Sequence, residues 1–136
     1  MEKTEKEQIK SFQDLEVYQN SYKASINVMK RIINQLPEIE KNDLRSQMSR
    51  SCKAIPRLIA EGFAKKHQKK AFQKYLDDSR GESNEMIVCL SHCRDLYDAH
   101  VDADLCEELL DAYDKTSRQL YNLSLAWTKF NDKSKD

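Results

Sequence analysis

The spacing of the apolar residues constrains this chain more than any other feature. Four long stretches repeat apolar side chains at intervals of three and four, which places them on one face of an α-helix. No stretch shows the alternation typical of a strand. With two glycines and two prolines in 136 residues, few turns are available. The sequence therefore predicts four long helices, over residues 12–36, 38–62, 69–98 and 103–130.

Capping and stop signals bracket the expected helices. Ser11 or Asp14 can supply a side-chain oxygen to the free N–H groups that begin the first helix. Pro37 ends that helix, because the residue before a proline resists helical geometry. Asp102 is placed to cap the fourth helix after a tight turn. These signals predict short connections between consecutive helices.

Pro56, Gly62 and Gly81 interrupt the good helix formers of the chain. We expect Pro56 to kink the second helix and to leave the Cys52 carbonyl without its usual donor. Gly62 suits the position after a helix, where a positive φ costs a glycine little. Gly81 falls inside the third helix, where glycine costs about 1 kcal/mol relative to alanine. We therefore expect a packing reason for Gly81.

Four long helices with short connections favour an all-α fold, an antiparallel up-down-up-down four-helix bundle. A length of 136 residues suits a single domain. We expect residues 12–130 to form the bundle. Residues 1–11 read as a charged flexible tail, and residues 131–136 as a polar tail.

The chain shows no signal for export or membrane insertion. No apolar run approaches the roughly 20 residues of a membrane-spanning helix. Residues 1–10 are charged and lack the apolar segment of a secretory signal. We therefore expect a cytoplasmic protein with no membrane partner. Free thiols are then expected at all four cysteines, Cys52, Cys89, Cys93 and Cys106.

Charge is unevenly distributed along the chain, although Lys and Arg balance Asp and Glu at 23 each. Residues 41–74 contain ten Lys or Arg and two acids, whereas residues 95–114 contain eight acids and no Lys or Arg. A chain with a basic and an acidic half can associate head to tail with itself, or bind an anion on one face.

The densest basic cluster lies between the second and third expected helices. Phosphate contact by such a cluster would depend strongly on salt and little on sequence. A solvated loop is the alternative, and the zero net charge argues against a dedicated nucleic-acid binder. The cluster also contains His67. The residues that we predict for contact with RNA or DNA are Arg57, Lys65, Lys66, Lys69, Lys70 and Lys74.

A cysteine-histidine motif in the third helix suggests a metal or catalytic site. Cys89 and Cys93 are one turn apart, so both can face one ion. They also flank Leu90 on the apolar stripe, where cysteine behaves as a small hydrophobe. His92 points about 100° away from Cys93 and is poorly placed to activate it. We therefore expect no metal, no cofactor and no catalytic centre.

Glu61 and Glu85 are the remaining candidates for acid–base chemistry. A bundle-core di-metal site would need Glu-x-x-His pairs on two helices, and the sequence has none. Arg50 and Arg80 are available partners. We therefore expect structural ion pairs rather than an enzyme, and no small-molecule substrate.

Residues 54–62 are the most distinctive stretch of the chain, Ala-Ile-Pro-Arg-Leu-Ile-Ala-Glu-Gly. They resemble the Ser-Ile-Pro-Ser-Asn-Ile-Ala-Glu-Gly signature of proteins encoded within intervening sequences of bacterial large-subunit ribosomal RNA genes. Residues 12–19 look like that family's Phe-x-Asp-Leu-x-Val opening. Two helical patterns also fit the family, one through Leu44, Gln47 and Arg50, and one through Phe72, Tyr75, Leu76, Gly81 and Glu85.

The resemblance extends from about residue 12 to residue 121, with three departures. Ala54 stands where the family usually has Ser, Leu58 where it has Asn, and Glu82 where it has Ser. The matched motif positions are interpreted as structural. They are Asp14, Gln47, Arg50, Pro56, Glu61, Gly62, Gly81 and Glu85.

The resemblance implies an antiparallel four-helix bundle and a ring-like homopentamer. It also implies distant similarity to the accessory variability determinant of diversity-generating retroelements, a pentameric bundle that binds nucleic acid and a reverse transcriptase. The family has no established biochemical activity. We therefore predict a self-assembling, non-enzymatic scaffold that contacts RNA or DNA, or is associated with a reverse transcriptase. The alternative is a protein–protein interaction module with no nucleic-acid role.

Overall fold

A computed structural model describes residues 9–134, with side chains described as far as Trp127. Within this range all regular structure is helical. Residues 1–8 of the expected N-terminal tail and residues 135–136 of the expected C-terminal tail lie outside the described residues. The main helices are α2 (Glu16–Asn27), α3 (Leu44–Phe63), α4 (Lys69–Leu96) and α5 (Ala103–Ser134).

The first expected helix is divided into shorter pieces. Residues 12–14 form a 3₁₀ turn, closed by a capping box in which Ser11 accepts from the Gln13 N–H at 3.2 Å and Asp14 accepts from the Ser11 N–H at 3.1 Å. Leu15 is then extended (φ −73°, ψ 125°) and buried, so α2 starts only at Glu16. After α2, a π turn (Val28–Ile32) and a 3₁₀ turn (Ile33–Gln35) carry the chain to Pro37.

The second helix begins later than its apolar pattern predicts. Residues 38–40 form a separate 3₁₀ turn, and α3 starts at Leu44 instead of residue 38. The Glu40 carboxylate accepts from the Leu44 N–H at 3.3 Å and from the Tyr97 hydroxyl. Glu40 therefore caps α3 and ties its start to the end of α4, which holds the chain in a turn before the helix.

The helix α3 runs through Pro56 and ends at Phe63. Gly62 therefore lies inside the helix, and neither glycine has a positive φ. Our prediction of a positive-φ stop at Gly62 is wrong. The physical reason for glycine there is the neighbouring helix, because an added Cβ would lie 2.7 Å from the Cβ of Tyr75 and 3.2 Å from Phe72.

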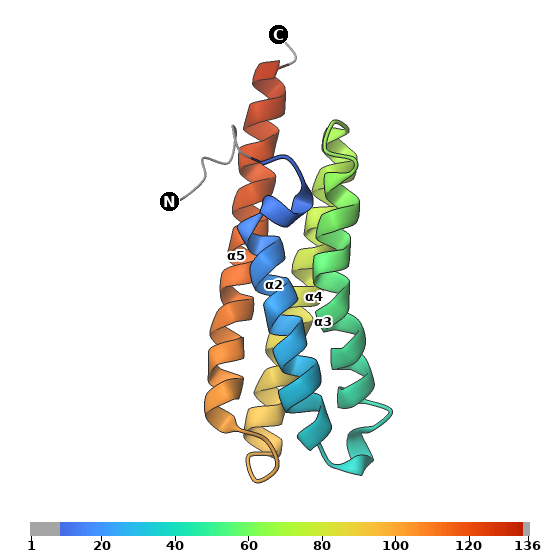
Figure 1. The fold of residues 1–136 in the computed structure, drawn as a ribbon, viewed down its shortest axis with the longest axis vertical. Coiled ribbons are helices and arrows are strands. Elements are labelled where there is room, and N and C mark those ends of the chain that lie inside the picture. The colour runs from blue at the N-terminus through green and yellow to red at the C-terminus, as the bar shows by residue number, and fades with distance from the viewer. Residues whose placement is uncertain (1–8, 135–136) are drawn as a thin grey trace.

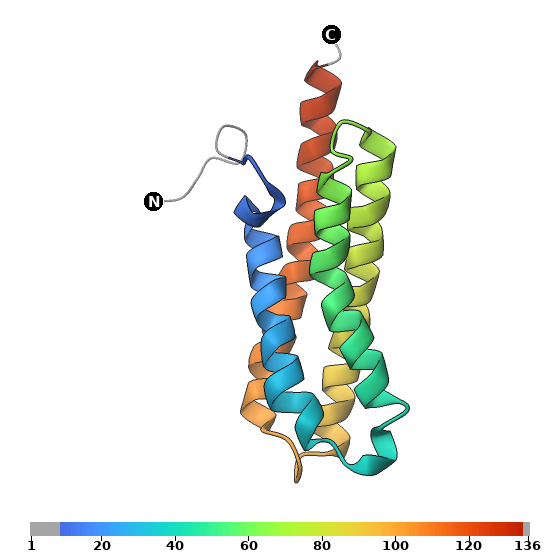
Figure 2. The same cartoon turned by 45° about the vertical axis from the view of Figure 1, so that its right-hand side comes forward.

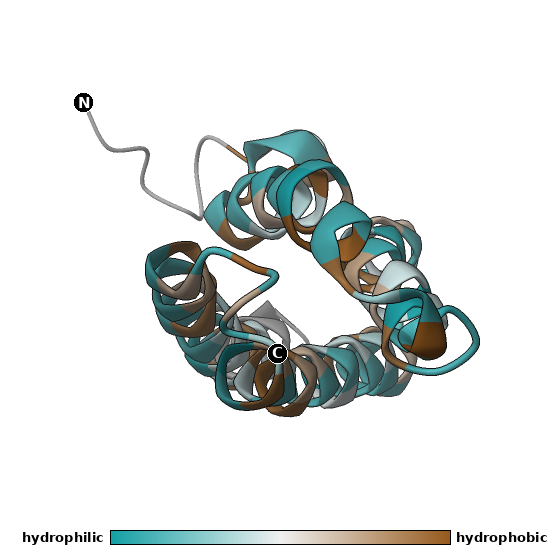
Figure 3. Cartoon of the chain, turned by 90° about the horizontal axis from the view of Figure 1, so that it is seen from below, coloured by the Kyte–Doolittle hydropathy of each residue, from teal (hydrophilic) through white to brown (hydrophobic). Residues whose placement is uncertain are grey.

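The helices pack side by side as a bundle, in which α4 contacts α3 and α5, and α2 contacts the same two helices. The α2–α3 and α4–α5 connections lie at one end, and the α3–α4 turn lies at the other (Figure 1). A view turned by 45° shows the same arrangement (Figure 2), and the end-on view shows the four helices around a shared interior (Figure 3). No described helix has the length and apolar character needed to cross a membrane.

The core is apolar, with buried serines at the helix crossings. Ser79 of α4 donates to the Ile55 carbonyl of α3 at 3.1 Å. Ser83, one turn on, donates to the Tyr113 carbonyl of α5 at 3.0 Å. Both serines are fully buried, so α4 is joined to each neighbour by a small side chain that also permits close approach. The largest fully buried side chains include Ile32, Met48, Ile55, Ile59, Phe72, Leu76, Met86, Leu90, Tyr113 and Leu120.

Candidate functional site

The predicted basic cluster lies at the α3–α4 turn, at one end of the bundle (Figure 1). We call residues 64–70 the basic turn. Lys65 and Lys70 are exposed, whereas Lys66 and Lys69 are half-buried. No acidic residue occurs between Gly62 and Lys74. The structure therefore places four predicted lysines within one short segment at the surface.

Aromatic side chains hold the basic turn in place. The Trp127 indole N–H donates to the Lys66 carbonyl at 3.0 Å, which joins α5 to the turn. The indole ring packs edge-on against Phe72, with centroids 5.1 Å apart, and against Phe63, at 6.2 Å. The Lys66 ammonium lies 4.2 Å from the centre of the Phe63 ring, a cation–π contact. The turn is thus anchored to three helices.

Arg57 and Lys74 extend the basic surface along α3 and α4, but both have acidic partners. Arg57 lies 3.9 Å from Glu61, and Lys74 lies 3.2 Å from Asp78, each one turn away on the same helix. Exposed pairs of this kind contribute little to stability. They do reduce the local positive charge, so the predicted site is strongest at the basic turn and weaker toward Arg57 and Lys74.

Acidic residues gather at the opposite end of the bundle, where α4 ends and α5 begins. Arg94 lies there between Asp95, at 2.7 Å, and Glu107, at 2.8 Å. Hydrogen bonding to Arg94 lowers the pKa of Asp95. The charge asymmetry of the sequence therefore becomes an asymmetry along the length of the bundle. The acids that the end of α4, the following turn and the start of α5 contribute are Asp95, Asp98, Asp102, Asp104, Glu107 and Glu108.

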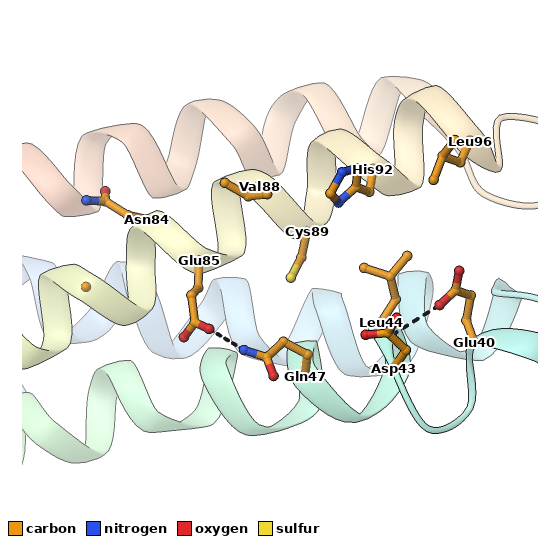
Figure 4. A pocket seen from close by; sticks show the side chains of 11 residues that line it. Glu40, Asp43, Leu44, Gln47, Asn84, Glu85, Val88, Cys89, His92 and Leu96 are labelled. Carbon is orange, nitrogen blue, oxygen red and sulfur yellow. Dashed lines mark hydrogen bonds between the residues drawn. The ribbon is translucent and has the colours of Figure 1, made fainter.

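The motif residues Gln47 and Arg50 of α3 meet Glu85 of α4. The Gln47 amide donates to the Glu85 carboxylate (Figure 4). Arg50 bridges two carboxylates, with nitrogen–oxygen distances of 2.9 Å to Glu82 and 3.2 Å to Glu85. Buried Ser51 lies below them and has its hydroxyl 3.1 Å from Glu82 and 3.2 Å from Glu85. We call these five residues the motif cluster.

Hydrogen bonding within the motif cluster affects the acidity of Glu85. The pKa of Glu85 lies below its ordinary value, first because of the hydrogen bond with Glu82 and then because of Arg50 and Ser51. These contacts outweigh the partial burial of the carboxylate, which acts in the opposite direction. A carboxylate whose pKa lies below its ordinary value is suited to an ion pair between helices, and it is a weak proton acceptor for catalysis.

Sequence reasoning did not include Ser51 and Glu82 among the site residues. The spacing contained a usable signal, because Glu82 and Glu85 are three apart on α4 while Gln47 and Ser51 are four apart on α3. Polar residues at those intervals share a helix face. Glu82, which departs from the family's usual Ser, supplies the closest contact of Arg50 with the cluster.

The other motif positions have separate structural roles. Asp14 closes the capping box before α2. Glu61 pairs with Arg57 and not with Arg80, whose guanidinium lies 5.2 Å from the centre of the Tyr121 ring. Gly81 is exposed, and an added Cβ would meet nothing within 4 Å. The described part of the chain therefore holds no packing contact that explains Gly81.

A groove with a volume of about 620 Å³ runs between α3 and α4 beside the motif cluster (Figure 4). We call it the α3–α4 groove. Its lining includes two exposed apolar side chains of α4, Val88 (56% exposed) and Leu96 (61%). Figure 4 shows Glu85 and Cys89 pointing from α4 toward Gln47 and Leu44 of α3. The sequence carries no distinctive signal for Val88 and Leu96, because isolated apolar residues on a polar face are common.

The four cysteines are buried free thiols. Burial raises the pKa of Cys52 and Cys89 to about 11 and that of Cys93 to about 12. Such thiols are protonated at neutral pH and are poor nucleophiles. Cys93 contacts the Met48 sulfur at 3.6 Å, in the core, while His92 is exposed. In the part of the chain that the structure describes, no three His, Cys, Asp or Glu side chains are arranged to hold a metal ion.

Comparison with known proteins agrees with these structural motifs. Residues 13–122 match the family described as 23S rRNA-intervening sequence protein. The match spans α2, α3, α4 and most of α5, and it includes the motif cluster and the basic turn. No curated protein and no solved structure matches significantly. The chain therefore belongs to the 23S rRNA-intervening sequence protein family.

Proposed function

We propose that this protein is a non-enzymatic scaffold, an antiparallel up-down-up-down four-helix bundle that self-assembles and presents its basic turn to RNA or DNA. The observation that carries the proposal is the set of four lysines at one end of the bundle, with no acidic residue between Gly62 and Lys74. Lysine ammonium groups bind phosphate oxygens and displace counterions from nucleic acid. The lysines are Lys65, Lys66, Lys69 and Lys70.

The anchoring of the basic turn supports this proposal. Trp127 and Phe63 fix the backbone and one of the lysines, so binding would cost less conformational entropy than binding by a loose loop. In a ring-like homopentamer, the assembly that the family resemblance implies, five basic turns would act together. Linking weak sites raises the effective affinity by mass action alone.

The charge and family context also favour nucleic acid as the class of partner. The acid-rich segment, residues 95–114, begins at the other end of the bundle (Figure 1), so it lies away from an anion at the basic turn. The family's name refers to intervening sequences of 23S rRNA. The proposal includes the distant similarity to the accessory variability determinant of retroelements, and hence association with a reverse transcriptase. The buried free thiols fit the reducing cytoplasm in which we place the protein.

A salt titration tests the proposal. Short labelled RNA and DNA would be titrated with protein from about 50 to 200 mM salt, with the mass measured by light scattering in the same buffers. Binding should weaken with a log–log slope of about −3 to −4 if four phosphates are contacted. Changing all four lysines to Glu should abolish binding and leave the mass unchanged.

Two matched variants guard against effects on folding. Lys65→Glu with Lys70→Glu reverses the two exposed lysines of the basic turn. Lys23→Glu with Lys41→Glu reverses the same number of exposed charges elsewhere. The first should weaken binding much more than the second. Equal losses from the two, or binding that survives the four-site variant, would refute the basic turn as the contact.

The second candidate function is a protein–protein interaction module with no nucleic-acid role. The exposed Val88 and Leu96 in the α3–α4 groove favour it, because apolar side chains in a hollow suit a protein surface. An oligomer that binds no nucleic acid at about 50 mM salt, where phosphate contacts are strong, would select this candidate. Pull-downs treated with nuclease should then retain a protein partner.

A further inference from the structure

Gly81 occupies a position where this chain has no need of a glycine. It lies on the exposed side of α4, well inside the helix, and its φ is not positive. An added Cβ would meet nothing within 4 Å. Glycine destabilises the interior of a helix relative to alanine, and the described part of the chain offers no contact that compensates. Close approach of a surface from outside the chain would account for a glycine at position 81.

The surroundings of Gly81 have the character of an interface. It lines the α3–α4 groove together with Val88 and Leu96. More than half of each of these two apolar side chains is exposed, at 56% and 61%. Figure 4 shows Val88 and Leu96 along the same helix as Glu85, at the edge of the groove. A small residue beside exposed apolar residues allows a partner helix to approach closely while it covers apolar surface.

The charge of the α3–α4 groove is negative. Three carboxylates line it, from Glu40, Asp43 and Glu85, and no Lys or Arg does. Arg50, beside the groove, pairs with Glu82 as well as with Glu85, so it does not offset the other two carboxylates. The complementary surface therefore combines apolar side chains with cations.

The chain itself carries such a surface between α2 and α3. We call it the α2–α3 face. It has a hollow of about 360 Å³ whose lining includes Lys53 and Arg57 and no carboxylate. Tyr22 and Ile26 supply exposed apolar area there, at 51% and 39%. Arg57 pairs with Glu61 at 3.9 Å, so the net positive charge of this face comes mainly from Lys53. The chain thus has two apolar surfaces of opposite charge, which share the helix α3.

We propose that the α3–α4 groove of one copy binds the α2–α3 face of another copy, with Gly81 at the point of closest approach. Two grooves facing each other would bring carboxylates together, and two α2–α3 faces would bring cations together, so the unlike pairing is favoured. A contact between two different faces leaves one of each free, which builds a ring if the rotation closes and a filament if it does not. This inference rests on the self-assembly in the proposed function and identifies its surfaces.

Substitutions in the groove test its location. The mass would be measured by sedimentation over a range of concentrations without nucleic acid, with helicity checked by circular dichroism. Val88→Lys should weaken association about tenfold or more, because it places a cation in the contact beside Lys53 and Arg57. Leu125→Lys is the matched control, since Leu125 is similarly exposed (47%) on α5, outside both surfaces. Gly81→Ala should also weaken association while the single chain stays folded.

A charge swap tests whether the surface that binds the α3–α4 groove is the α2–α3 face of another copy. Lys53→Glu and Asp43→Lys each place like charges across the proposed contact, and each should weaken association. Both side chains are exposed, and neither is in an ion pair that the structure shows. The double variant restores opposite charges and should recover a large part of the lost affinity.

The possible results separate this inference from the proposed function. A wild-type chain that stays monomeric at all concentrations would refute self-assembly and this contact with it, and would leave the groove to a different protein. A wild-type oligomer unaffected by Val88→Lys and Gly81→Ala would overturn the groove alone. An oligomer weakened by Val88→Lys, with no recovery in the double variant, would overturn the α2–α3 face as the occupant.

Discussion

Gly62 and Gly81 have similar helical backbones and very different surroundings. The Cβ of an alanine at position 62 would come within 2.7 Å of Tyr75. We expect Gly62→Ala to lower the free energy of unfolding by about 1–3 kcal/mol, because α3 and α4 must move apart. At position 81 an alanine meets nothing, so Gly81→Ala should raise the free energy of unfolding by about 1 kcal/mol through helix propensity alone.

Urea unfolding, at concentrations low enough for the single chain, measures both variants. Replacing glycine by alanine should therefore lower the free energy of unfolding at position 62 and raise it at position 81. Because the two effects have opposite signs, each variant is a control for any general effect of removing a glycine. A loss of stability in both would show that Gly81 is also closely packed within the chain. No loss at Gly62 would show that the two helices separate easily.

The buried thiols predict a loss of stability at alkaline pH. Burial raises the pKa of Cys93 to about 12 and that of Cys52 to about 11, whereas a thiol in the unfolded chain titrates at about 8.5. Because the pKa of each thiol is higher in the folded chain than in the unfolded chain, the protonated thiol contributes its full stabilisation only below the pKa of the unfolded chain. This stabilisation declines as pH rises toward the folded pKa, because only the unfolded chain ionises. By pH 10 the loss should reach about 2 kcal/mol for Cys52 and about the same for Cys93.

Urea unfolding at several values from pH 7.5 to 10 measures this slope. Cys93→Ala supplies the control, since it removes one thiol and keeps the lysines and tyrosines that also titrate in this range. The variant should be less stable than wild type at pH 7.5, because it leaves a cavity, but should lose less stability on going to pH 10. Parallel pH profiles would contradict a buried, protonated Cys93.

At the scale of the element, the motif cluster joins α3 to α4. Arg50 is 53% exposed and Glu82 only 18% exposed, so their ion pair is partly protected from water. A double-mutant cycle with Arg50→Gln and Glu82→Gln should give a coupling energy of about 0.5–1 kcal/mol. The pair Lys74–Asp78, one turn apart on α4 and more exposed, is the control and should give about 0.3–0.5 kcal/mol.

The sequence predicts the helices better than their ends. Apolar spacing is repeated through each helix, so four helices and their inner faces follow from it. The start of α3 at Leu44 depends on Glu40, which accepts hydrogen bonds from the Leu44 N–H and from the Tyr97 hydroxyl at the end of α4. Glu40 and Tyr97 are 57 positions apart in the sequence. A periodic pattern carries no information on such contacts. Leu15 is a similar case, because it continues the apolar stripe and yet is extended.

The same limit explains the two glycines. From sequence, Gly62 resembles a helix stop and Gly81 a packing residue, whereas the structure assigns packing to Gly62 and none within the chain to Gly81. Whether a helical glycine is crowded depends on the register between neighbouring helices, which the spacing along one helix does not specify. The basic turn was predictable, because its lysines are adjacent in sequence and need only a connection between helices to expose them.

At the scale of the whole molecule, the ends of the bundle differ in charge and its sides differ in apolar exposure. The ends support a contact with phosphates, and the sides support a contact between copies. Both contacts should weaken as ionic strength rises, but the contact between copies also covers apolar groups and should weaken less. The contact with phosphates and the contact between copies can therefore occur together. The assembly would then bring several basic turns close to one another.

Trp127 gives this arrangement an optical signal. It is the single tryptophan of the chain, and its indole N–H bonds to the Lys66 carbonyl inside the basic turn. Indole emission responds to polarity and to nearby charge, so a phosphate chain bound at the turn should change the intensity or wavelength of the intrinsic fluorescence. Binding observed by anisotropy of a labelled RNA without any change in tryptophan emission would indicate another contact surface. The protein thus contains its own fluorophore at the place where a partner is proposed to bind.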